Sequence, residues 1–192
     1  MKEDASKKLV IITAPSGSGK STVVNFLLKD LPELSFSVSA CTRAPRGNEQ
    51  HGVHYYFLSL EEFTRKIANH EFAEFEMVYE GKYYGTLKQE LERIWAANKI
   101  PLIDIDVQGA LRLVRHYGKN ACSIFLQAPS IALLEERLRK RATDSEASII
   151  ERIQKATVEL SFKNQFDHIV VNDTLPEACK QTYTIITQFL AD

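Results

Sequence analysis

A short apolar strand that runs directly into a glycine-rich loop is the feature that most constrains this chain. Residues 9–13 read Leu-Val-Ile-Ile-Thr, and residues 14–21 read Ala-Pro-Ser-Gly-Ser-Gly-Lys-Ser. Glycines let the backbone wrap around an anion, and a helix that begins there directs its unpaired N–H groups at the charge. The alternative is a Gly/Ser turn whose lysine is only solvated. The order of strand, loop and helix favours a phosphate-binding loop.

The loop nearly matches the nucleotide-binding pattern G-x-x-x-x-G-K-[ST], with Ala14 where the first glycine is expected. An alanine fits this position if its φ is negative. The pattern predicts that Lys20 reaches the β- and γ-phosphates of a nucleotide and that the Ser21 hydroxyl binds Mg²⁺. The predicted ATP-binding residues of the loop are Ala14, Pro15, Ser16, Gly17, Ser18, Gly19, Lys20, Ser21 and Thr22.

Composition excludes several other classes of protein. The chain has 192 residues and a formal net charge of −1, so its bulk charge favours neither nucleic acid nor an anionic membrane as a partner. No apolar run approaches the roughly 20 residues that span a bilayer, and the polar residues 1–8 leave no room for a signal peptide. Three widely spaced cysteines are typical of free thiols in a reducing compartment. We expect a cytoplasmic protein, and its oligomeric state stays open.

Apolar strands alternate with amphipathic helices along most of the chain. The predicted strands are residues 8–13, 35–39, 55–58, 72–79, 101–107, 122–126 and 167–171. The predicted helices are residues 20–30, 60–67, 86–97, 110–117, 130–141, 146–163 and 176–190. This alternation predicts an α/β fold with a parallel sheet and helices on both faces. Residues 37–85 break the rhythm with short strands and many aromatic residues, and they predict an inserted, mainly antiparallel subdomain.

The insert contains residues suited to a second phosphate. Arg43 and Arg46 lie three residues apart in a proline-containing loop, and guanidinium groups hold phosphate oxygens in a fixed fork. Tyr55, Tyr83 and Tyr84 add hydroxyl donors. Solvated surface arginines and core tyrosines are the alternative. Because side chains alternate along a strand, only one of Tyr55 and its neighbour is expected to face a ligand. The set favours a pocket for a nucleoside monophosphate.

Two acids follow a buried strand beside the loop. Asp104 and Asp106 alternate along the predicted strand 101–107, which places both carboxylates on one side of it. The alternative is a strand end capped by solvated acids. We expect Asp104, together with Ser21, to anchor Mg²⁺, in the case of Asp104 through water.

A basic helix is predicted at residues 130–141. Arg137 and Arg141 lie one turn apart on one face of it, and Arg152 lies on the next predicted helix. A solvent-facing helix with salt bridges is the alternative, which we expect to hold for Arg139 and Lys140.

Several segments, in this order, resemble the guanylate kinase family of P-loop nucleoside-monophosphate kinases, over about residues 8–190. Besides the loop, they are residues 37–39, 42–46, 54–57, 71–74, 81–86, 102–109 and 169–173. The resemblance implies one domain over residues 1–192 with a P-loop NTPase core, a mixed or antiparallel GMP-binding insert and a helical lid. The implied bounds are about 1–36, 98–128 and 161–192 for the core, 37–97 for the insert and 129–160 for the lid.

The resemblance also implies roles for single residues. Arg43, Arg46, Tyr55 and Tyr84 would hold the GMP phosphate, and Ser39, Glu74, Thr86 and Asp106 would read the guanine. Asn172 would contribute to the ATP site. Catalytic roles are implied for Lys20, Arg43, Arg137, Arg141 and Arg152, with the last three in a lid that closes over the triphosphate. The chemistry agrees at Glu74, because a carboxylate accepts hydrogen bonds from guanine N1–H and N2–H₂, whereas adenine presents the opposite pattern.

The implied reaction is the reversible transfer of the γ-phosphoryl group of ATP to GMP or dGMP, with Mg²⁺ and without a covalent intermediate, in purine metabolism and GMP recycling. Two alternatives remain. A protein-binding scaffold with the same fold is disfavoured by the intact loop and lid arginines. A P-loop kinase for another phosphorylated metabolite is disfavoured by Ser39, Glu74 and Asp106 together.

Overall fold

The larger of two β-sheets forms the core of the computed structural model, which describes residues 7–79, 81–140 and 145–191. Its five strands lie in the order β2-β7-β1-β8-β9, and every neighbouring pair is parallel. The strands are β1 (Leu9–Thr13), β2 (Leu34–Phe36), β7 (Ile100–Asp104), β8 (Ala121–Gln127) and β9 (His168–Val171). This sheet confirms the predicted parallel α/β core.

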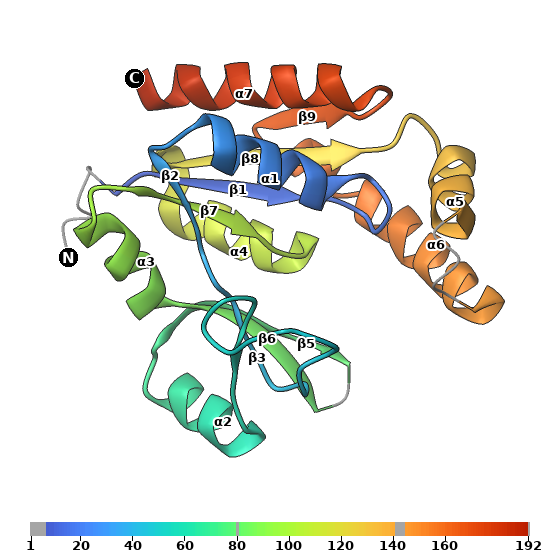
Figure 1. The fold of residues 1–192 in the computed structure, drawn as a ribbon. Helices are drawn as coiled ribbons and strands as arrows, with labels where there is room; N and C mark the ends of the chain where they lie inside the picture. Colours follow the sequence, from blue (N-terminus) through green and yellow to red (C-terminus); the bar gives the residue numbers. More distant parts are fainter. Residues whose placement is uncertain (1–6, 80, 141–144, 192) are drawn as a thin grey trace.

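Helices cover both faces of the core sheet, with α1 and α7 on one face and α3 and α4 on the other (Figure 1). Their bounds are α1 (Lys20–Asp30), α3 (Lys88–Ala96), α4 (Val107–Tyr117) and α7 (Leu175–Ala191), with short 3-10 helices at Gly118–Asn120 and Lys163–Gln165. Both layers follow from the alternation of apolar residues along the parallel strands, which are buried on both faces.

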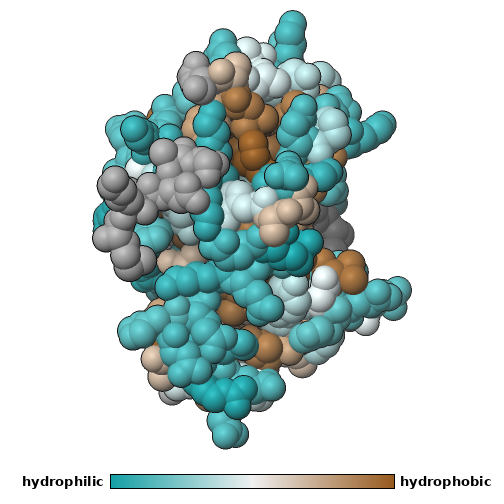
Figure 2. Space-filling model, turned by 90° about the vertical axis from the view of Figure 1, so that its left-hand side faces the viewer, coloured by the Kyte–Doolittle hydropathy of each residue, from teal (hydrophilic) through white to brown (hydrophobic). Residues whose placement is uncertain are grey.

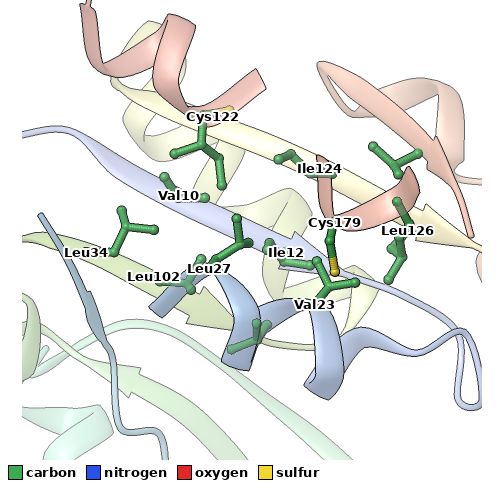
Figure 3. Packing of buried hydrophobic residues seen from close by; sticks show 14 of the residues in the cluster. Val10, Ile12, Val23, Leu27, Leu34, Leu102, Cys122, Ile124, Leu126 and Cys179 are labelled. Atoms are coloured by element: carbon green, nitrogen blue, oxygen red, sulfur yellow. The ribbon is translucent and has the colours of Figure 1, made fainter. Parts of the chain in front are cut away.

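The central strand β1 shows how one sequence supplies both layers. Its side chains alternate, so Val10 and Ile12 pack with the α1 and α7 layer (Figure 3), and Leu9 and Ile11 pack with the α3 and α4 layer. All four are fully buried, and burial of each contributes roughly 1.5–3 kcal/mol. The loop that follows β1 is therefore attached to the most buried strand of the core.

A second sheet lies below the core in Figure 1 and is formed by the insert. Its strands follow the order β4-β3-β6-β5, with β3 parallel to β4 and antiparallel to β6. The elements are β3 (Ala40–Cys41), β4 (Tyr56–Phe57), α2 (Leu60–Ala68), β5 (Phe72–Tyr79) and β6 (Lys82–Leu87). Ser59 and Glu62 form a capping box at the start of α2, and Phe63 stacks on Phe72 at 4.3 Å between ring centroids.

Two further helices, α5 (Ile131–Lys140) and α6 (Glu146–Leu160), lie together at one end of the core sheet (Figure 1). The face at the left of Figure 1 is mostly hydrophilic, and apolar residues are visible there mainly in recesses between polar side chains (Figure 2). Among the described residues, no helix combines the length and the apolar composition needed to cross a bilayer.

The structure differs from the predicted elements at the edges of the insert. The predicted helix at residues 86–97 begins only at Lys88, because Thr86 and Leu87 pair with β5. Strand β6 itself was not predicted, since its sequence Lys-Tyr-Tyr-Gly-Thr-Leu has no apolar alternation and contains a glycine. The predicted strand 35–39 ends at Phe36, and residues 37–39 cross from the core to the insert.

The predicted strand 101–107 is also shorter than expected. Strand β7 ends at Asp104, so the prediction that Asp106 lies on the same strand is wrong. Asp106 instead caps the N-terminus of α4, and its Oδ1 accepts hydrogen bonds from the backbone N–H groups of Gln108 and Gly109 at 2.9 and 3.1 Å. The preference of aspartate for this capping position competes with its place in a strand, and the alternation of residues 101–107 does not reveal that preference.

Candidate functional site

The glycine-rich loop has the backbone geometry of an anion cradle. Gly17 and Gly19 have φ angles of 92° and 89°, which residues with a Cβ rarely adopt. Within the described part of the chain, His70 and Asn98 are the only residues besides glycines that have a positive φ. Ala14 therefore has a negative φ, and the condition under which alanine fits this position is met.

The buried side-chain amide of Asn172 holds the backbone of the loop. Asn172, which follows β9, is 4% exposed and donates from Nδ2 to the carbonyl of Ser18 at 2.7 Å. A Cβ on Gly19 would lie 2.4 Å from the same Nδ2 atom. Arg137 on α5 donates in turn to the carbonyl oxygens of Asn172 and Asp173 at 3.0 and 3.3 Å. The structure thus places Asn172 under the loop, with its amide directed at loop backbone.

Lys20 is the first residue of α1 and faces the carboxyl end of β7. Its ammonium forms an ion pair with Asp104 and donates to the carbonyl of Ile105 at 3.3 Å. Ser21 is exposed beside it. The lysine, the hydroxyl and the carboxylate predicted from the sequence are therefore neighbours at the end of the parallel strands, where α/β proteins bind their ligands.

One cavity of about 420 Å³ lies over the loop. The loop forms one wall, α6 forms a second wall through Ser148, Arg152 and Lys155, and Arg46 from the insert also lines the cavity. Arg152 donates from Nη1 to the Ser16 hydroxyl oxygen at 2.6 Å. The same cavity thus brings together Arg152 and Arg46, both of which the sequence predicted to bind phosphate. Lys155, Glu151 and Glu159 also line this cavity, and sequence reasoning missed all three.

A second cavity, of about 210 Å³, lies between the core and the insert. It is lined by five of the residues predicted to bind GMP, namely Ser39, Tyr55, Glu74, Tyr84 and Asp106. Lys20, Tyr84 and Asp106 line both cavities. The loop cavity and the insert cavity therefore meet at shared side chains, with Lys20 at the junction.

Glu74 is a buried carboxylate directed into the insert cavity. It is 5% exposed, and its Oε1 accepts a hydrogen bond from the fully buried Thr86 hydroxyl at 2.8 Å. Burial raises the pKa of Glu74 to about 7, against the opposing effect of the Thr86 hydrogen bond. Gly109 of α4 makes room for it, because a Cβ there would lie 2.6 Å from Glu74 Oε2. Thr86 thus orients the carboxylate.

Arg43 lies behind Tyr55 and is held by an acid that sequence reasoning missed. The Arg43 guanidinium stacks 4.7 Å from the centroid of the Tyr55 ring. Glu49 accepts from Arg43 Nη1 and Nη2 at 2.5 and 2.8 Å. These hydrogen bonds lower the pKa of Glu49 to about 2. No local spacing signals the pair, since the loop between the two residues is irregular.

The tyrosines divide between site and core. Tyr55 and Tyr84 line the insert cavity, whereas the hydroxyl of Tyr56 donates to Glu90 Oε2 at 2.9 Å on the other side of the sheet. The expectation that only one of Tyr55 and Tyr56 faces the site is confirmed. The expectation for Tyr83 is wrong, because its ring packs 5.4 Å from that of Phe63 in the core of the insert.

On α5, charged residues pair along the helix surface. Arg139 binds Glu135 at 2.8 Å and Glu146 at 2.5 Å, and Lys140 binds Glu136 at 2.5 Å. The salt-bridged surface expected for Arg139 and Lys140 is confirmed. Arg141, predicted as a lid arginine, lies outside the described residues.

Known proteins match nearly the whole chain. A family model described as guanylate kinase matches residues 6–189. The guanylate kinase of Porphyromonas gingivalis is 51% identical over 185 residues, which cover 96% of this chain and 98% of that protein. The guanylate kinase of Bacteroides fragilis is 48% identical over 183 residues, covering 95% of this chain and 90% of that protein.

A solved structure agrees with these relatives. The crystal structure of guanylate kinase from Anaplasma phagocytophilum superposes with a TM-score of 0.75 at 31% identity, over 94% of this chain and 85% of that one. The residues that the family model matches include the loop, the insert and the core described above. The chain belongs to the guanylate kinase family of enzymes, which are ATP:GMP phosphotransferases.

Proposed function

We propose that this enzyme transfers the γ-phosphoryl group of ATP to GMP or dGMP in one Mg²⁺-dependent step, with closure of α5 and α6 over the triphosphate. The observation that carries the proposal is the meeting of two cavities at Lys20, Tyr84 and Asp106. A triphosphate on the loop and a monophosphate in the insert cavity would approach each other at this junction. The products, ADP and GDP, fit a role in purine metabolism and GMP recycling.

Guanine would bind in the insert cavity against Glu74. The ionised carboxylate accepts hydrogen bonds from guanine N1–H and N2–H₂, and the Ser39 hydroxyl is available to donate to O6. Thr86 already donates to Glu74, so its role toward guanine is to orient that carboxylate. Asp106, whose Oδ1 caps α4, would complete the base pocket with its other oxygen.

The GMP phosphate would lie at the entrance that both cavities share. Tyr84 lines both cavities, and Arg46 reaches the loop cavity from the insert. Arg43 stacks on Tyr55, and Glu49 fixes the plane of its guanidinium. These donors would hold the phosphate in line with the γ-phosphoryl group of ATP. Alignment of this kind accounts for much of the rate enhancement in phosphoryl transfer.

Charge on the transferred group would be neutralised by cations from three parts of the chain. Lys20 belongs to the loop, and Arg152 reaches Ser16 from α6. Arg137 is held at the carbonyls of Asn172 and Asp173, from which it would move to the triphosphate when the lid closes, together with Arg141. Because GMP itself attacks the phosphoryl group, no covalent enzyme intermediate and no general base are needed.

The residues around Lys20 fit a Mg²⁺ ion that is held mainly by substrate phosphates. Among the described residues, no group of three or more His, Cys, Asp or Glu could hold a metal by itself, and Mg²⁺ in kinases usually takes one or two protein ligands besides phosphate oxygens and water. Ser21 would bind it directly and Asp104 through water. When bound, Mg²⁺ neutralises charge on the phosphate oxygens.

A coupled assay of ADP release tests the proposal. Purified enzyme with ATP and Mg²⁺ would receive GMP, dGMP, AMP, CMP or UMP in turn. We expect turnover with GMP and dGMP, none above background with the other three, and loss of activity when EDTA removes Mg²⁺. Turnover with AMP at a rate similar to that with GMP would contradict the assignment of the base pocket. No turnover with any of the five nucleotides, in folded protein, would contradict the proposed reaction.

A further inference from the structure

A buried carboxylate behind the insert cavity has no part in the chemistry proposed above. Glu90 of α3 has a side chain only 1% exposed, and the described structure gives it four hydrogen bonds. Its Oε1 accepts from the backbone N–H of Val38 at 3.0 Å and from Arg93 Nη2 at 2.8 Å. Its Oε2 accepts from the Tyr56 hydroxyl and from Arg93 Nε, both at 2.9 Å.

Two of the three partner residues come from the places where the chain passes between core and insert, and the third comes from inside the insert. Val38 lies in residues 37–39, through which the chain enters the insert, and α3 follows β6, through which it returns to the core. Tyr56 lies on β4 inside the insert. The α3 helix stands at the junction of the two parts (Figure 1). One carboxylate therefore ties the incoming segment, β4 and the outgoing helix together.

Two of these bonds, those from Val38 and Tyr56, hold the immediate neighbour of a residue that lines the insert cavity. Val38 precedes Ser39, Tyr56 follows Tyr55, and both Ser39 and Tyr55 line the cavity. Side chains alternate along an extended chain, so the Tyr56 side-chain contact on the rear face sets where Tyr55 points on the front face. The bond to the Val38 backbone N–H holds the chain directly before Ser39. The backbone N–H of Tyr56 also donates to the carbonyl of Ser39 at 2.9 Å, which couples the two segments directly.

Burial of the Glu90 carboxylate costs desolvation free energy, and packing does not require a charged side chain at this position. Apolar residues of similar volume often replace a buried charged group and its partner without loss of stability, so stability alone is a weak reason for a carboxylate here. Only the carboxylate is buried in this pair, since the Arg93 side chain is 55% exposed. A carboxylate with several donors does fix one geometry, because each donor must meet a particular lone pair. A cavity lined by residues from separate segments needs those segments to keep a fixed position relative to one another.

We propose that Glu90 is a positioning residue that holds Ser39 and Tyr55 in register and thereby sets the affinity for GMP without touching the nucleotide. The inference deepens the proposed function and rests on it. It concerns only the insert cavity, because Ser39 and Tyr55 line that cavity and do not line the loop cavity. The ATP side of the site should therefore be indifferent to Glu90.

Glu90→Ala removes the acceptor for all these donors, and Glu92→Ala is the matched control on the same helix. The Glu92 side chain is 58% exposed and pairs with Lys7 at 2.8 Å, away from the insert. We expect Glu90→Ala to raise KM for GMP by roughly tenfold and to leave KM for ATP within about twofold of wild type. Glu92→Ala should change neither value.

Tyr56→Phe is a milder variant that keeps Glu90 and deletes one tie. It should raise KM for GMP by roughly threefold, in the same direction and with KM for ATP unchanged. If Glu90→Ala does not fold, this variant decides the matter. Wild-type KM for GMP in Tyr56→Phe and in any folded Glu90→Ala, or an equal rise in both KM values, would overturn the proposal.

Amide hydrogen exchange separates failure of this proposal from failure of the proposed function, since it needs no substrate. The Val38 N–H should exchange faster in Glu90→Ala than in Glu92→Ala, because it loses its acceptor, and residues 39–41 should follow. If wild type phosphorylates GMP but neither KM nor exchange responds, the positioning role alone is wrong. If wild type does not phosphorylate GMP, the exchange of residues 38–41 still decides whether Glu90 holds this segment.

Discussion

The two halves of the site are built in different ways. The loop half is one continuous segment, residues 14–21, whose backbone forms the cradle and whose glycines supply the required φ angles. The insert half collects side chains from separate elements, such as Tyr55 beside β4, Glu74 from β5 and Tyr84 from β6, and adds Asp106 from the start of α4. One half depends on local backbone geometry, and the other depends on tertiary packing.

This difference has consequences for what each half can recognise. Backbone N–H groups attract any phosphate, so a loop of this kind gives affinity with little discrimination between nucleotides. Buried side chains with fixed donors and acceptors distinguish bases, because a wrong base leaves them unpaired. We therefore expect substitutions in the loop half to affect the rate of transfer, and substitutions in the insert half to affect the choice and affinity of the acceptor. The following experiments could break that division.

The largest effect is expected for Lys20→Met. Loss of the ammonium at the junction of the cavities should lower kcat by roughly 10²–10³-fold and leave GMP affinity, measured by titration calorimetry, close to wild type. Lys29→Met, at the exposed opposite end of α1, is the matched control and should retain full activity. A large loss of GMP binding in Lys20→Met would show that the two halves are not separable.

Gly109→Ala should disturb the insert half by direct contact with Glu74. The new Cβ would lie 2.6 Å from Glu74 Oε2, so the carboxylate must shift from the position in which Thr86 holds it. We expect KM for GMP to rise by roughly tenfold with KM for ATP unchanged. Gly109 lies in the first turn of α4, and alanine favours a helix more than glycine does, so we do not expect a fall in Tm to explain the loss. An unchanged KM for GMP would mean that Glu74 has room to move.

The pH dependence of GMP use should report the ionisation of Glu74. Burial raises its pKa to about 7, and guanine needs the ionised form, so kcat/KM for GMP should rise as pH increases through about 7. The raised pKa also means that the folded state binds this proton more tightly than the unfolded state does. The free energy of unfolding should therefore fall as the pH rises from about 4.5 to about 7.

Glu74→Gln supplies the comparison for the pH profile, because both proteins share the ionisation of the GMP phosphate. The variant should lose the step near pH 7 and keep any step due to the nucleotide. A wild-type profile identical in shape to that of the variant would show that Glu74 does not titrate in this range.

The smallest effect is expected for Asn172→Ala. The change leaves the Ser18 carbonyl without its donor, which costs about 1–3 kcal/mol for a buried group and should lower the Tm. Because the amide is directed at the loop backbone, KM for ATP should rise only a few-fold and KM for GMP should stay unchanged. A rise in KM for GMP alone would place Asn172 in the wrong half of the site.

The same division explains what the sequence revealed. The loop, α1 and the parallel core were predictable, because strand, glycines and helix follow one another within local spacing and β1 alternates between two apolar layers. The insert was harder. Strand β6 forms because it pairs with β5, which has no local signal. Asp106 leaves the strand because its carboxylate caps α4, a local effect that competes with the apolar alternation of residues 101–107.

The partners of the acidic side chains inside the insert could not be predicted from the sequence either. Glu49 and Glu90 are fixed by partners that the fold brings to them, Arg43 in one case and Val38 with Tyr56 in the other. The guanine-reading set was accessible only through resemblance to a family, because Glu74 sits in an acidic segment where no spacing distinguishes it from its neighbours.

The most direct test of the division is calorimetric titration of GMP alone, and of ATP alone, into wild type and Glu74→Gln. The neutral amide keeps the size of the side chain but replaces one acceptor of guanine with a donor. We expect GMP affinity to fall at least roughly tenfold, with ATP affinity unchanged. Equal weakening of both nucleotides, or unaltered GMP binding, would contradict the account that guanine is recognised by the buried carboxylate of a separately built half-site.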